Sequence, residues 1–107
     1  MHDFESINKR IELVGSLASY EHDDAWVLAE IGDVLATGYA AALQADARCL
    51  RLTEQVERLL LDGEPPERAG ELARERSTLA DATRGLRDRL ALLRELSAQM
   101  SARAGAA

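Results

Sequence analysis

The 107-residue sequence has few cysteines, prolines and aromatic residues, and each scarcity excludes a class of protein. A single cysteine, Cys49, excludes an internal disulfide and fits a reducing compartment. Aromatic residues make up 4% of the chain and none follows Tyr39, so most of any core must be aliphatic. The two prolines are adjacent and therefore mark one break in the chain rather than a loop-rich fold.

Signals for membranes and secretion are also missing. No apolar run approaches the roughly 18 to 20 residues that a membrane-spanning helix needs. The first residues lack the basic and apolar regions of a secretory signal. These features predict one soluble, cytoplasmic domain with no membrane insertion. The strong preference for arginine over lysine suggests a GC-rich, bacterial genome.

Charge is distributed unevenly between the two halves of the chain. Residues 1–46 carry acidic groups opposed only by Lys9 and Arg10, whereas in residues 47–107 acidic residues and arginines nearly balance. Nucleic-acid affinity comes mainly from phosphate neutralisation, so we expect no nucleic-acid partner. The later arginines alternate with glutamates, which favours solvated helix faces with i,i+3 and i,i+4 pairs. The alternative is a local site for an acidic partner, formed by Arg84, Arg87 and Arg94.

Apolar and small residues recur at alternating steps of three and four along two long segments. The first seam consists of Leu28, Ile31, Leu35, Gly38, Ala42, Ala45, Cys49, Leu52, Val56 and Leu59. The second consists of Leu72, Arg76, Leu79, Thr83, Leu86, Leu90, Leu93, Ser97 and Met100. This spacing predicts two long helices that face each other, and the tight turn at residues 62–66 makes them antiparallel.

The full prediction is an all-α fold, a long antiparallel helical hairpin of coiled-coil type with a short N-terminal helix and a three-helix bundle at one end. We expect helices over about residues 3–19, 24–61 and 66–100 in a single domain, residues 1–100, followed by a frayed tail, residues 101–107. Gly63 is the residue type favoured just after a helix, and Pro66 suits the start of the next one.

The turn position also sets the register of the hairpin. It places Gly38 opposite Leu90 and Ala42 opposite Leu86, so small residues face large ones and the seam can fill without voids. Arg76, opposite Leu52, is the exception, and its stem can run along the edge of the seam.

The first helix is too short to match the hairpin and should cover only its open end. Its apolar residues are Phe4, Ile7, Ile11, Val14 and Ala18. The expected groove is formed by Val27, Val34, Ala41, Leu92 and Leu96. Residues 46–82 then remain a two-helix arm, with Leu50, Leu60 and Leu61 outside the seam. These leucines either contact a partner or are ordinary exposed leucines.

Candidate chemistry is sparse. The four residues from Glu21 to Asp24 are consecutive at a helix start, so a helix cap explains them better than a metal site. Cys49 lies on the seam and is expected to behave as a small core residue. No phosphate loop, paired metal ligands or nucleophile–base spacing is present. The sequence therefore predicts no enzyme activity, no catalytic residues, no cofactor and no metal.

Two stretches resemble a known group of proteins. The turn from Glu57 to Arg68, with its helix–Gly-x-x-Pro-Glu–helix pattern, resembles the hairpin of small co-chaperones of type III secretion needle subunits. The Leu-x-x-Glu-Arg-x-x-Leu rhythm of Leu72–Leu79 is similar to that of flagellar export chaperones. The resemblance covers about residues 50–90 and implies a small cytosolic protein that holds a secretion substrate or another chaperone by helix packing. Only Gly63 and Pro66 are carried over, as turn formers.

Three functions follow from these observations. The leading prediction is a non-enzymatic module that binds a protein partner by helix packing, as an export chaperone or adaptor would. The first alternative is a homodimeric structural or regulatory protein, for example of the anti-sigma type. The third is a binder of a small anionic ligand through Arg84 and Arg87.

Overall fold

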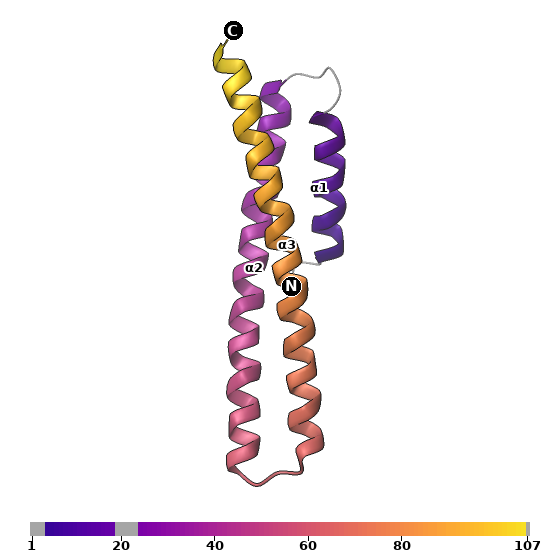
Figure 1. Cartoon of the computed structure of the whole chain (residues 1–107), viewed down its shortest axis with the longest axis vertical. Coiled ribbons are helices and arrows are strands. Elements are labelled where there is room, and N and C mark those ends of the chain that lie inside the picture. The colour runs from indigo at the N-terminus through magenta and orange to yellow at the C-terminus, as the bar shows by residue number, and fades with distance from the viewer. Residues whose placement is uncertain (1–3, 19–23, 107) are drawn as a thin grey trace.

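The computed structural model describes residues 4–18 and 24–106, which form three helices (Figure 1). They are α1 (Phe4–Ala18), α2 (Asp24–Leu61) and α3 (Pro66–Ala106). The long helices α2 and α3 pack antiparallel, and the molecule is a rod of 66 × 20 × 17 Å. The predicted fold class, an all-α hairpin with a short N-terminal helix, is confirmed.

The helix boundaries differ from the prediction mainly at the C-terminal end. Helix α3 continues to Ala106, so the tail predicted to fray from residue 101 is helical for six more residues. Alanine, the strongest helix former, makes up three of these six residues, and no proline interrupts them. The predicted first and last residues of the first helix, residues 3 and 19, lie outside the described residues.

The turn between α2 and α3 is closed by a Schellman motif. In this motif a residue in the left-handed conformation follows the helix, and two backbone amides donate hydrogen bonds to carbonyls in the last helical turn. The Glu64 amide donates to the Leu59 carbonyl at 3.1 Å, and the Gly63 amide donates to the Leu60 carbonyl at 3.3 Å. Gly63 has a φ of 71°, a conformation that glycine adopts without a Cβ clash. Pro66 then opens α3 at a position where its missing amide hydrogen costs nothing. The roles predicted for both residues are confirmed.

One half of the hairpin is covered by α1, which lies beside α2 and α3 only there (Figure 1). Ile7 and Val14 are buried, and Phe4, Ile11 and Ala18 pack partly buried against the same core, as the sequence predicts. The core that α1 covers contains Val27, Ile31, Val34, Ala41, Ala42, Leu86, Leu90, Leu93 and Met100. This end is therefore the expected three-helix bundle.

The register of the hairpin is also as predicted. A Cβ built on Gly38 would lie 2.5 Å from Leu90 Cδ2, so the two residues are in direct opposition. Ala42 and Leu86 belong to one buried cluster. The absence of a side chain at Gly38 therefore lets α2 and α3 approach closely at this level.

One residue of the predicted groove is misplaced. Leu92 is 67% exposed, although Leu96 packs partly buried against the core. The buried face of α3 is set by Leu90 and Leu93, and a residue one step from Leu93 is turned by about 100° around the helix. That rotation carries Leu92 into solvent, so it does not line the groove.

Helix α2 is long and apolar enough to cross a membrane by length and composition alone, a test that core helices of soluble proteins also pass. The prediction that no apolar run approaches this length is therefore wrong, because a long apolar segment can include up to two charged residues. In the structure, Val27, Ile31 and Val34 of this helix are buried against α1 and α3.

Candidate interaction surfaces

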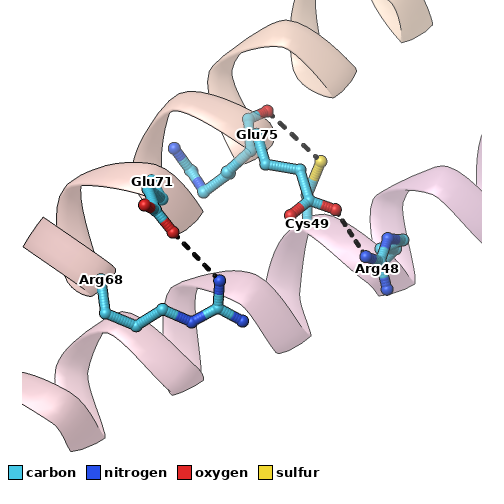
Figure 2. A network of polar contacts seen from close by, with 6 residues as sticks. Arg48, Cys49, Arg68, Glu71 and Glu75 are labelled. Atoms are coloured by element: carbon cyan, nitrogen blue, oxygen red, sulfur yellow. Dashed lines mark hydrogen bonds and ion pairs between the residues drawn. The ribbon is translucent and has the colours of Figure 1, made fainter.

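The arm, residues 46–82, contains only α2 and α3 and buries few side chains. Within it, Leu52, Ala69 and Leu72 are buried. Polar contacts supplement this thin core. Arg48 of α2 and Glu75 of α3 form an ion pair at 2.5 Å, which Figure 2 marks with a dashed line. The Cys49 thiol lies 3.9 Å from the Arg76 carbonyl, at the limit of a weak sulfur hydrogen bond.

The three leucines predicted to lie outside the seam are exposed. The exposed fractions are 61% for Leu50, 60% for Leu60 and 87% for Leu61. Leu50 and Leu61 are eleven residues apart, close to three full helical turns, so they share one line along α2. Leu60 is turned by about 100° from that line and belongs to a different face.

A shallow hollow lies in the arm on the face that carries Leu60. It has a volume of about 280 Å³ and is lined by Thr53, Val56, Glu57, Ala73 and Arg76. Arg76 occupies a seam position, but the residue is exposed and forms part of the wall of the hollow. Leu60 follows Val56 by four residues and Glu57 by three, so it continues the same face one turn onward. We call this hollow the arm hollow; Leu60 lies next to it and is not one of its lining residues.

Sequence reasoning missed a second exposed apolar surface, on the face of α2 that points away from the core. Leu43 is 66% exposed and lies one heptad before Leu50. We define the outer stripe as the exposed residues Ala29, Gly32, Ala36, Ala40, Leu43, Ala47 and Leu50. The spacing of these residues by three and four is present in the sequence. A surface helix usually has a single apolar face, however, and the inner seam already accounts for one.

The outer stripe lies opposite the core. Ala36 stands two residues from both Val34 and Gly38, which are buried, and residues two apart point to nearly opposite sides of a helix. No charged residue occurs anywhere between residues 34 and 45. A helix that is apolar on both faces is usually buried on both. The outer stripe therefore has the composition of an interface.

The three predicted arginines do not form one site. Arg84 pairs with Asp81 on its own helix at 3.3 Å. Arg87 donates two hydrogen bonds to the Asp46 carboxylate across the hairpin, one of them at 3.1 Å. Arg94 is exposed, and no ion pair involves it within the described residues.

The Asp46–Arg87 contact shifts the pKa of both partners. The hydrogen bonds from Arg87 hold the pKa of the Asp46 carboxyl below its usual value, and partial burial opposes this effect. The same hydrogen bonds raise the pKa of Arg87. An anionic ligand at Arg87 would have to displace an internal carboxylate in bidentate contact.

Residues that could bind a metal ion are not clustered in the part of the chain that the structure describes. No group of three or more His, Cys, Asp or Glu side chains among them could hold a metal ion. Glu21, His22 and Asp23 lie outside the described residues, and α2 begins at Asp24. Cys49 lies on the seam but is half-buried, so it is not part of the buried core that the sequence predicts for it.

Comparison with known proteins gives no family. No protein-family model, curated protein or solved structure matches the chain significantly.

Proposed function

We propose that this chain is a non-enzymatic interaction module that binds a helix of a partner protein along its arm. The observation that supports this proposal is the arm hollow together with exposed Leu60 one turn away. A partner helix recognised by a groove presents apolar anchors at i, i+3, i+4 and i+7. One such anchor would fill the hollow and the next would pack on Leu60. Glu57 and Arg76 at the rim offer one charge of each sign to flanking polar groups.

The resemblance of residues 50–90 to export chaperones adds a class of partner to this proposal. The partner would be a secretion subunit or a second chaperone, held by helix packing before assembly. The thin core of the arm supports this role, because a two-helix segment gains stability when a third helix covers its open side.

The experiment starts from a partner captured from host lysate and identified by mass spectrometry, then titrated as a purified protein. Leu60→Glu places a charge beside the hollow and Ala73→Phe fills it, so each should weaken binding by about 30-fold or more, the loss expected at a hot spot. Leu92→Glu is the matched control, because Leu92 is as exposed as Leu60 but lies outside the arm. Circular dichroism should remain helical for all three variants.

Unchanged affinity in both arm variants, with binding lost in Leu92→Glu, would refute the arm as the binding surface. The competing anionic-ligand function is weaker, since Arg87 is already occupied by Asp46. Thermal stabilisation by phosphate that disappears in Arg84→Gln would favour that function instead.

A further inference from the structure

We infer that the outer stripe of α2 is the contact surface of a homodimer, in which a second copy packs antiparallel across a two-fold axis near residues 39 and 40. This inference does not depend on the proposed arm function, because the two surfaces lie on different faces. Both α1 and α3 pack on the opposite side of α2, so the stripe is open to a second chain.

Self-complementarity of the stripe identifies the partner as a second copy. A two-fold axis between Tyr39 and Ala40 pairs residues at equal distances on either side of it. Leu43 then meets Ala36 of the partner subunit, and Leu50 meets Ala29 of the partner subunit. Gly32 meets Ala47 of the partner subunit, small against small, so the two helices can also approach closely at this level.

Every large residue of the stripe therefore faces a small one, and by symmetry each contact occurs twice. This is the arrangement that fills an interface without voids or overpacking. An unrelated partner would not require the stripe to be symmetric about its own centre. A parallel second copy would instead set Leu43 against Leu43 of the partner subunit and leave gaps at Gly32.

The charges beside the stripe fit the same arrangement. Asp33 and Arg51 are eighteen residues apart, five full turns, so they lie on one edge of the stripe. Arg51 is exposed and has no ion pair within the described residues. Side chains on a helix generally lean toward its N-terminus, and this lean would bring the Arg51 guanidinium to the level of Asp33 of the partner subunit. Asp33 holds Arg10 at 3.0 Å through Oδ2 only, so a second donor can approach.

The size of the contact predicts its strength. With the axis near residue 39, the two α2 helices lie side by side over residues 24–55, a length of about 47 Å. A strip of that length and about 10 Å wide covers roughly 900 Å² on the two protomers together. Specific interfaces of that size are at the weak end of the range. The dimer should therefore dissociate on dilution.

Sedimentation equilibrium of the full chain, from about 1 to 200 μM, tests the dimer by mass action. The mass should double over this range, and Leu43→Glu and Gly32→Leu should each weaken association by about 30-fold or more. A Cβ at Gly32 meets nothing within 4 Å in the monomer, so that variant should fold normally. Two variants on α3 are the matched controls: Leu92→Glu, because Leu92 is as exposed as Leu43, and Gly85→Leu, because a Cβ at Gly85 also meets nothing within 4 Å. Their dimer dissociation constants should stay within threefold of the wild-type value.

Spin labels test the direction of packing in a Cys49→Ser background. A label at Gln44→Cys should lie about 14 Å along the axis from its symmetry mate, and one at Gln55→Cys about 47 Å. Two short distances would mean parallel packing and overturn the inference. A mass that stays monomeric to 200 μM would also overturn it, as would a dimer lost in Leu60→Glu and kept in Leu43→Glu. Loss of the dimer in Leu43→Glu with partner binding intact would separate this surface from the arm.

Discussion

Between Val27 and Ala45, α2 buries seven residues, whereas between Asp46 and Leu61 it buries only Leu52. The same two helices run through both regions, and the difference is the presence of α1. In the covered half, α1 gives α2 a second neighbour, so a wide apolar face is buried there. In the arm each helix has one neighbour and buries one narrow seam, supplemented by ion pairs.

Those ion pairs do not replace the missing core. Arg48 and Glu75 keep 39% and 46% of their side chains exposed, and surface pairs contribute about 0–1 kcal/mol each. The arm should therefore be the first part of the hairpin to open, as expected where few apolar contacts protect the backbone. A region of low local stability beside an unfilled hollow is suited to gaining stability from a partner.

The largest expected effect is the loss of unfolding free energy when a core leucine is shortened to alanine, and it should differ between the two regions. Leu90→Ala should cost about 4 kcal/mol and Leu72→Ala about 2 kcal/mol, because the surroundings of Leu72 in the arm can close over the space. Leu90 is fully buried and Leu72 is 5% exposed. Urea unfolding at low protein concentration measures both values. An equal or greater loss for Leu72→Ala would show that the arm is as tightly packed as the covered half.

The next effect tests the close approach in the covered half. Gly38→Leu should cost about 1–3 kcal/mol despite the better helix propensity of leucine, because its side chain would overlap Leu90. Gly32→Leu serves as the reference, since it gains the same propensity in open space. Thermal unfolding of both variants at low concentration gives the comparison. Equal stabilities would contradict the tight contact.

The residues that sequence reasoning placed correctly are those fixed by periodicity and local chemistry. The inner seam, the register at Gly38 and the turn at Gly63 all follow from spacing and from one glycine in a left-handed position. The exposure of Leu92 could not be predicted in this way, because the position of the groove depends on the direction from which α1 packs. That direction depends on all three helices together and has no local signature.

The candidate surfaces divide in the same way. Exposure of Leu50, Leu60 and Leu61 was predictable, since they fall off the seam. The arm hollow was not predictable, because it depends on how side chains of both helices pack around the charged seam residue Arg76. The outer stripe carries a sequence signal of its own, yet its meaning depends on which face of α2 the other helices cover.

A smaller effect should appear in the polar contacts at the boundary between the regions. Asp46→Asn should cost up to about 1 kcal/mol, as its carboxylate is half-exposed and the pair is partly screened. Because the folded pKa of Asp46 is lowered, its contribution is present above the unfolded pKa of about 3.9 and is lost as pH falls through the folded value. Unfolding at pH 7 and at pH 3 should therefore differ less in Asp46→Asn than in the wild type. An identical pH dependence would mean that the Asp46 contact contributes nothing in solution.

The smallest expected effect concerns Cys49, where the arm contains a group with potential chemistry. Its thiol is half-buried and makes only a long contact to the Arg76 carbonyl, so Cys49→Ala should change stability by less than about 1 kcal/mol. Partner affinity should stay within about threefold, because a small seam residue outside the arm hollow does not supply a hot spot. Titration of the purified partner against the wild type and Cys49→Ala measures this directly, and His22→Ala extends the test to the titratable cluster before α2. Loss of binding in either variant, with helicity intact, would contradict binding through apolar contacts and indicate a titratable site instead. The arm would then differ from the covered half in chemistry as well as in packing.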